Sequence, residues 1–119
     1  MAKDFLEKAN KAVPDKRQLE WMNVEFAGLI NFGLNTFTGR EEGTGFEEPD
    51  LFNPTSFSPQ QWVRVARNCG MKGLILNVKH HDGFCLWPTV YTDYSVKSSK
   101  WQDGEGDVVE AVSRCCKEE

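Results

Sequence analysis

No segment of the sequence is apolar for long enough to cross a bilayer. A membrane helix needs about 20 consecutive apolar residues, whereas the apolar stretch 26–34 is short and broken by two glycines and an asparagine. The first ten residues mix charged and apolar side chains and lack the apolar core of a secretory signal. We therefore expect no membrane span, and either a cytoplasmic protein or one whose signal has been removed.

The sequence also lacks a strong net charge and any concentrated basic segment. The formal charge is −4, and the 14 lysines and arginines are scattered along the chain. Binding along a nucleic-acid backbone requires clustered positive charge, so nucleic acid is not an expected partner. With 39% hydrophobic and 12% aromatic residues, the 119-residue chain has the composition of a folded globular protein.

Cysteine is too sparse to support a disulfide framework. The chain has four cysteines at irregular spacing: Cys69, Cys85, Cys115 and Cys116. Because free cysteine behaves as a small apolar residue, we expect all four to be buried.

The first part of the chain combines a polar opening, one apolar run and a long irregular segment. Residues 1–18 could form a helix or a loose arm, with a turn at Pro14. The run 26–34 predicts a fully buried strand. Residues 36–54 are rich in glycine, proline and acidic side chains, which predicts a long loop, and long loops are commonly functional.

A helix is predicted from Pro59 to Cys69. Ser58 can serve as its N-cap and Gln61 can complete a capping box, while Gly70 is suited to end it. Three side chains at helical spacing are expected on its buried face: Trp62, Ala66 and Cys69.

A second buried strand is predicted over residues 73–78, followed later by a helix that begins near Asp107. Asp107 and Glu110 have the spacing of a capping box. The buried face of this helix is expected to hold Val108, Val112 and Cys115. Strand, helix and strand form a βαβ unit, which predicts parallel strands and an α/β fold.

Two strands and two helices cannot cover both faces of a parallel sheet. The sequence therefore predicts about two βα units from a larger α/β fold, and a complete α/β barrel, one such fold, needs about 250 residues. Exposed sheet edges favour self-association. In such barrels the functional groups follow the strands, here residues 31–37 and 79–84.

The second of these segments carries a family resemblance. The sequence KHHDGFCLWP, residues 79–88, followed by Tyr91, Thr92 and Ser95, resembles the signature segment of the glycoside hydrolase family 29 α-L-fucosidases. The strand and loop INFGLNTFTGREEGTG and the helix over 57–70 are also similar to that family. The resemblance covers about residues 21–116, which divides the chain into an N-terminal arm or helix, 1–20, and the first, incomplete part of a catalytic barrel, 21–119.

This resemblance implies that the chain is the N-terminal fragment, about two βα units, of a (β/α)8-like barrel. It also implies an exo-acting, retaining hydrolase that removes terminal α-L-fucose from glycans without a cofactor. It implies that His80 and His81 bind the fucose hydroxyls and that Glu41 is a pocket glutamate. Retaining hydrolysis needs two carboxyl groups about 5 Å apart. The family supplies its catalytic pair from a later part of the barrel, so we expect no catalytic residue within this chain and no activity from it alone.

Two positions depart from the family pattern. Asn31 stands where the family usually has histidine, and Glu42 stands where tryptophan is common. Asparagine can hydrogen-bond a sugar hydroxyl, but it does not titrate near neutral pH. These departures keep a second hypothesis open, namely a noncatalytic or vestigial sugar-binding protein.

Adjacent histidines can enter one pocket only where a strand ends, because neighbouring strand side chains point to opposite faces. Asp82 and Gly83 are suited to form the necessary turn, which favours a structural role for Asp82 over a catalytic one. Without the motif, a structural role for the histidines would be as plausible as a functional one. Phe84 and Trp87 could offer apolar faces to the sugar.

A zinc site at His80, His81 and Cys85 is the competing interpretation of the motif. Zinc prefers nitrogen and sulfur ligands, but this spacing matches none of its usual patterns and no second ligand cluster exists, so we expect no metal.

Two further expectations concern side chains elsewhere. Trp62 and Trp101 should lie in the core, and a solvated loop face should hold Glu42, Glu47 and Glu48.

Overall fold

A computed structural model describes residues 2–119. Its α-helices are α1 (Ala2–Ala9), α2 (Lys16–Met22), α3 (Asn35–Thr38), α4 (Pro59–Asn68) and α5 (Val108–Glu118). Its strands are β1 (Ala27–Ile30) and β2 (Gly73–Leu76), and its 3-10 helices are η1 (Pro49–Leu51), η2 (Val96–Ser98) and η3 (Trp101–Gly104).

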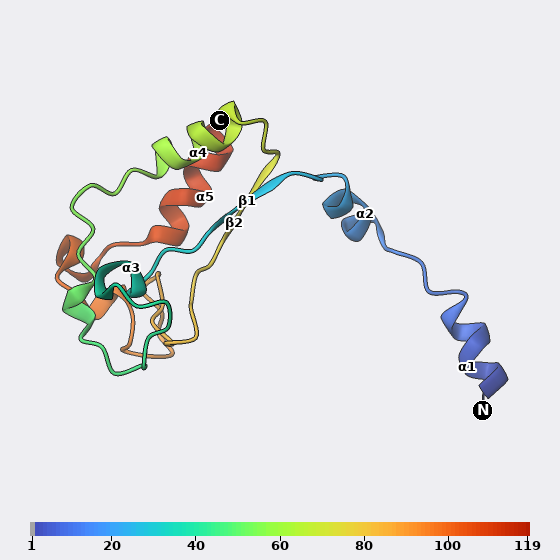
Figure 1. Ribbon diagram of the computed structural model, residues 1–119, viewed down its shortest axis with the longest axis horizontal. Helices are drawn as coiled ribbons and strands as arrows, with labels where there is room; N and C mark the ends of the chain where they lie inside the picture. The colour runs from blue at the N-terminus through green and yellow to red at the C-terminus, as the bar shows by residue number, and fades with distance from the viewer. Residues whose placement is uncertain (1) are drawn as a thin grey trace.

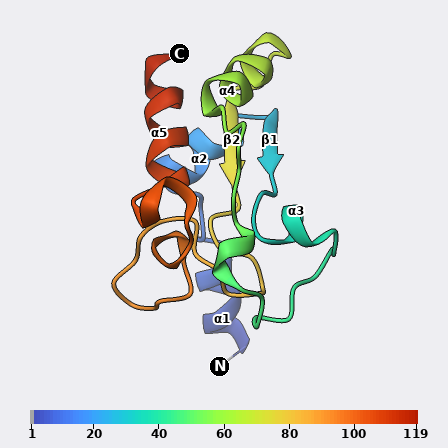
Figure 2. The same cartoon turned by 90° about the vertical axis from the view of Figure 1, so that its left-hand side faces the viewer.

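The two strands form a parallel sheet with α4 between them in sequence, which confirms the predicted βαβ unit and the α/β class. The register pairs Ala27 with Gly73 and Ile30 with Leu76. Figure 2 shows the strands side by side, both directed toward the loops that follow them. The carboxyl ends of β1 and β2 therefore meet at one edge of the sheet.

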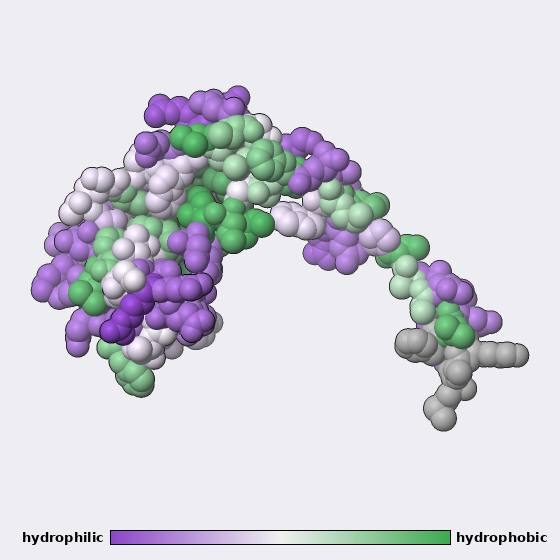
Figure 3. Space-filling model, viewed as in Figure 1, coloured by the Kyte–Doolittle hydropathy of each residue, from purple (hydrophilic) through white to green (hydrophobic). Residues whose placement is uncertain are grey.

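The strands are shorter and more exposed than the sequence suggested. The expectation of fully buried strands was wrong: Leu29 is 70% exposed and Ile75 is 42% exposed. The hydrophobic surface visible over β1 and β2 in Figure 3 belongs to a sheet whose outer face is uncovered in the described residues. Buried parallel sheets need cover on both faces, and here α4 and α5 lie on one side.

Helix α4 occupies nearly the predicted residues, but its cap and buried face differ from the prediction. Ser58 makes no side-chain cap hydrogen bond, because the amide of Gln61 donates to the Ser58 carbonyl at 3.1 Å and leaves no capping box. Cys69 follows the last helical residue and is exposed, whereas Val63, which was not predicted, is buried together with Ala66. Gly70 ends the helix with φ +80°, as expected.

Helix α5 agrees with its sequence pattern, except that only one half of the predicted capping box forms. The carboxylate of Asp107 accepts from the amide of Glu110 at 2.8 Å, which satisfies a free N–H group at the helix start. Its three buried side chains are those predicted: Val108, Val112 and Cys115. This face packs α5 against α4.

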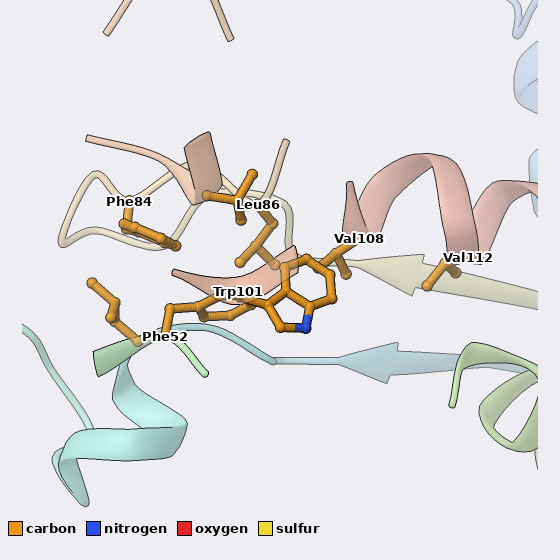
Figure 4. Close-up of a cluster of buried hydrophobic side chains, with 8 residues drawn as sticks. Phe52, Phe84, Leu86, Trp101, Val108 and Val112 are labelled. Carbon is orange, nitrogen blue, oxygen red and sulfur yellow. The ribbon is translucent and has the colours of Figure 1, made fainter. Parts of the chain in front are cut away.

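The main core lies among the loops beyond the strands rather than on the sheet. Figure 4 shows part of this cluster, with Trp101 between Phe52 and Val108. The aromatic rings of Phe52 and Trp101 pack edge to face with centroids 5.4 Å apart. Trp101 is 5% exposed and Trp62 packs against the cluster, so their predicted core positions are confirmed.

Residues 2–22 form two short helices that extend away from this body (Figure 1). The break between them includes Pro14, as expected. Helix α2 starts with a capping box that the sequence interpretation missed: Asp15 accepts from the Gln18 amide at 2.9 Å and Gln18 accepts from the Asp15 amide at 2.8 Å. The proposed division of the chain near residue 20 stays a prediction.

Two further expectations need correction. Cys69 and Cys116 are exposed, while Cys85 and Cys115 are buried, so only half of the cysteines behave as buried apolar residues. Cys69 directly follows α4, and Cys116 lies on the exposed side of α5. The loop 36–54 is not wholly irregular, because it contains most of α3 and the whole of η1.

Candidate functional site

Two asparagines meet at the carboxyl edge of the sheet. Asn31 follows β1 and Asn77 follows β2, and the Asn77 amide N–H donates to the Ile30 carbonyl at 3.0 Å. The Asn77 side-chain Nδ2 donates to Asn31 Oδ1 at 2.9 Å. Asn77 was missed from the sequence, although its position directly after β2 mirrors that of Asn31 after β1. The contact leaves the exposed Asn31 side chain with its NH2 group as a donor.

A turn immediately beyond β2 brings the two histidines together. The Gly83 amide donates to the His80 carbonyl at 3.0 Å, and Gly83 has φ +88°, a conformation that favours glycine. Asp82 is 6% exposed, and its Oδ1 accepts from the Phe84 amide at 2.8 Å. The predicted turn-forming role of Asp82 and Gly83 is confirmed.

The rings of His80 and His81 lie against one another, with centroids 4.1 Å apart and planes 53° apart. His80 is half-buried, and its Nδ1 is buried without a hydrogen-bond partner, whereas His81 is exposed. A neutral imidazole provides one donor and one acceptor, so adjacent rings can contact neighbouring hydroxyl groups of one ligand.

The histidine turn is closed by backbone hydrogen bonds on both sides. The Leu86 amide donates to the Val78 carbonyl at 3.0 Å, and Lys79 forms a β-bridge with Cys85. Cys85 also donates to the Tyr94 carbonyl at 3.1 Å and accepts from the Val96 amide at 3.0 Å. The turn is therefore attached at its base to the chain that continues into η2.

The loop over residues 39–48 lies against this turn. A Cβ atom placed on Gly43 would stand 2.8 Å from the Asp82 Cβ, which shows how closely the loop backbone approaches the Asp82 side chain. Glu41 precedes this contact by two residues and is exposed. In the part of the chain that the structure describes, no hydrogen bond joins Glu41 to either histidine.

Glu47 is the most strongly bonded acid of this loop. Hydrogen bonds from Thr44 and Gly45 lower the pKa of its carboxyl to about 2. Burial and the Glu47 charge raise the pKa of Tyr94, whose hydroxyl donates to Glu47 at 3.3 Å, to about 12. The expected solvated face holds for Glu42 and Glu48, which are exposed, but not for Glu47.

The two aromatic residues of the motif have different surroundings. Phe84 is 2% exposed and packs in the core against Phe52 and Tyr94, so the expectation that it faces a ligand was wrong. Trp87 is half-buried, and no aromatic contact within residues 2–119 joins it to the histidines.

Residues that could hold a metal do not converge here. No group of three or more histidine, cysteine, aspartate or glutamate side chains among residues 2–119 has the arrangement of a metal site. Burial raises the pKa of the Cys85 thiol, which disfavours the thiolate that zinc binds.

Among residues 2–119, none of the helices combines the length and apolar character required to span a membrane.

Comparison with known proteins now assigns the family. The model of the α-L-fucosidase family matches residues 4–119. The chain belongs to the α-L-fucosidase family. The expected resemblance is thereby confirmed, and the match extends through most of the N-terminal arm.

Relatives and solved structures agree with this assignment. α-L-Fucosidase 1 of Arabidopsis thaliana is 51% identical over 106 residues, which cover 89% of this chain and 21% of that protein. The crystal structure of a putative α-L-fucosidase from Bacteroides ovatus is 49% identical, with a TM-score of 0.86 over 89% of this chain and 18% of the other.

A fucosidase of glycoside hydrolase family 29 from Ruminococcus gnavus, solved in complex with fucose, is 35% identical, with a TM-score of 0.78. The alignment covers 90% of this chain and 22% of the other. The chain therefore spans about a fifth of the length of the curated relatives it matches.

Proposed function

We propose that this chain is the N-terminal part of a retaining α-L-fucosidase that removes terminal fucose from glycans. In this proposal, residues 21–119 begin a (β/α)8-like barrel, and the carboxyl edge of its first two strands contributes one side of the sugar pocket. The observation that carries the proposal is the His80 and His81 pair, whose rings lie in contact on a turn beyond β2. Active sites of such barrels lie at this end of the strands.

Each proposed pocket residue has a distinct task. His80 and His81 hydrogen-bond neighbouring fucose hydroxyls, and Glu41 accepts from another hydroxyl. Asn31 donates through the NH2 group that its contact with Asn77 leaves available. Trp87 offers an apolar face to the sugar ring or its methyl group. The substrate is a fucosylated oligosaccharide or glycan, consistent with the fucose bound by the Ruminococcus gnavus relative.

The chemistry requires carboxylates other than those proposed for this pocket. Retaining hydrolysis uses a nucleophile and an acid/base group about 5 Å apart. Glu41 alone cannot fill both roles, and the buried Asp82 is engaged in its turn. We assign the catalytic pair to the part of the barrel beyond these residues.

Hydrolysis of an aryl α-L-fucoside tests this function. The 119-residue chain should release no aryl alcohol, whereas a chain extended through the rest of the barrel should release it. NMR should show that the first-formed fucose retains the anomeric configuration. Turnover by the short chain that is abolished by Glu41→Gln would contradict the assignment of the catalytic carboxylates.

A noncatalytic fucose-binding protein is the second candidate, because Asn31 replaces the usual family histidine and is engaged by Asn77. An extended chain that binds fucose but releases no aryl alcohol would favour it. Recovery of turnover in that chain after Asn31→His would identify position 31 as the cause.

A further inference from the structure

One carboxylate links the loop over residues 39–48 to the segment that follows the histidine turn. Glu47 accepts four hydrogen bonds. Two come from Thr44, through its amide at 2.7 Å and its hydroxyl at 2.9 Å. The others come from the Gly45 amide at 3.0 Å and the Tyr94 hydroxyl at 3.3 Å. Glu47 therefore both closes its own loop and joins it to Tyr94.

The backbone of the loop lies directly on the turn. A Cβ atom on Gly45 would stand 3.1 Å from the Asp82 carbonyl oxygen, and Gly45 has φ +81°. Gly43 approaches the Asp82 side chain at 2.8 Å by the same measure. Side chains at these two positions would force the loop away from the residue next to His81.

Tyr94, which donates to Glu47, is itself held in place by the core. Its ring packs edge to face against Phe84, with centroids 5.4 Å apart, and Phe84 belongs to the buried core. Its carbonyl accepts from the Cys85 amide at 3.1 Å. The position of the Tyr94 hydroxyl is thus fixed by the same elements that hold the histidine turn.

We propose that Glu47 and Tyr94 are positioning residues, which hold loop 39–48 against the His80–His81 turn and thereby set the place of Glu41 in the pocket. The part that concerns Glu41 rests on the proposed function. Glu41 is two residues from Gly43, so a loop that lifts from Asp82 carries Glu41 away from the histidines.

Tyr94→Phe is the sharpest variant, because it deletes the hydroxyl that donates to Glu47 and keeps the ring that packs on Phe84. Tyr91→Phe is its matched control, since Tyr91 is 94% exposed. Hydrogen exchange in the full-length protein should become about three- to tenfold faster across residues 39–48 in Tyr94→Phe, the range expected for one lost hydrogen bond. Exchange equal to that of the wild type or of Tyr91→Phe would overturn the proposal.

Glu47→Gln should have a larger effect. It places an NH2 group where the carboxylate accepts from an amide or a hydroxyl, so two donors would face each other. Faster exchange of the loop than in Tyr94→Phe supports the proposed link, and unchanged exchange contradicts it.

A double-mutant cycle separates positioning from general stability. Calorimetry should show that Tyr94→Phe weakens fucose binding by about three- to tenfold, but by less than about twofold when Glu41→Gln is already present. Equal losses in both backgrounds would mean that Tyr94 does not act through Glu41, and would overturn that part of the proposal.

The two proposals can fail separately. A full-length wild-type protein that binds no fucose contradicts the proposed function, while the exchange measurement still decides whether Glu47 and Tyr94 hold the loop. Wild-type binding together with an additive cycle contradicts only the proposed effect on Glu41.

Discussion

The strands and the loops beyond them bury their apolar side chains to very different degrees. On the sheet, Leu29 is 70% exposed and Ile75 is 42% exposed, whereas Phe52 and Phe84 in the loops are 0% and 2% exposed. Parallel sheets are ordinarily the buried centre of an α/β fold. In this chain the loops carry the core, and the candidate pocket is fixed by them.

Phe52 lies at the centre of that core. Its ring contacts those of Phe32, Phe37, Phe84 and Trp101 at centroid distances of 5.3–5.6 Å. Phe84 comes directly after the histidine turn in the sequence. Phe52 therefore contacts a residue that adjoins the candidate pocket.

The largest effect is therefore expected from Phe52→Ala. Removing this ring should lower the free energy of unfolding by about 3–5 kcal/mol, because the surrounding rings cannot close the cavity completely. The matched change on the sheet, Leu29→Ala, should cost less than about 1 kcal/mol. Denaturant unfolding measures the free energy lost in each variant. Equal losses would contradict the contrast between the loop core and the sheet.

A smaller loss is expected from Gly106→Ala. A Cβ atom at this buried position would overlap the ring of Trp101. Overpacking of this kind costs about 1–3 kcal/mol. Ser113→Ala, on the exposed face of α5, is the control and should leave the unfolding midpoint unchanged. Thermal unfolding of the two variants gives the test, and a neutral Gly106→Ala would show that the loops pack less tightly than described.

Sequence patterns were most reliable where one residue fixes a local conformation. Asp107 at the start of α5, Gly70 after α4 and the Asp82–Gly83 turn were each anticipated, because capping and left-handed backbone depend on neighbouring residues. The family motif likewise identified the two histidines before their rings were seen together.

The remaining features depend on contacts between distant segments. The bond that joins Glu47 to Tyr94 could not be predicted, because the two residues are 47 positions apart. Asn77 gained its role only when β2 paired with β1 in register. Strand burial was overestimated because an apolar run indicates what a segment can bury, not what covers it.

The exposed sheet also predicts association of the isolated chain. At micromolar concentration it should sediment as oligomers, because apolar strand edges are free to pair. Leu29→Lys should shift the distribution toward monomer, whereas Leu6→Lys on α1 should not. Sedimentation of the wild-type chain as a single monomeric species would contradict this expectation.

The smallest expected effect is the pH dependence of the stability of the loop over residues 39–48. The pKa of Glu47 is lowered from 4.5 to about 2, so the ionised carboxylate stabilises its loop above about pH 4.5. That stabilisation is lost as the pH falls through 2. The NMR shift of the Thr44 amide proton should titrate near pH 2, and Glu47→Gln should remove the transition. A midpoint near 4.5 would mean that the carboxylate is not bonded as described.

The affinity for fucose, compared with and without each histidine, tests the sugar-pocket assignment most directly. Calorimetric titration of fucose should be compared between the wild-type chain, extended through the rest of the barrel, and its His80→Ala and His81→Ala variants. Each substitution should weaken binding by about 1–3 kcal/mol, because sugar hydroxyls lose their partners. Unchanged affinity would contradict the account, as would stoichiometric zinc in the purified protein that disappears with the same substitutions.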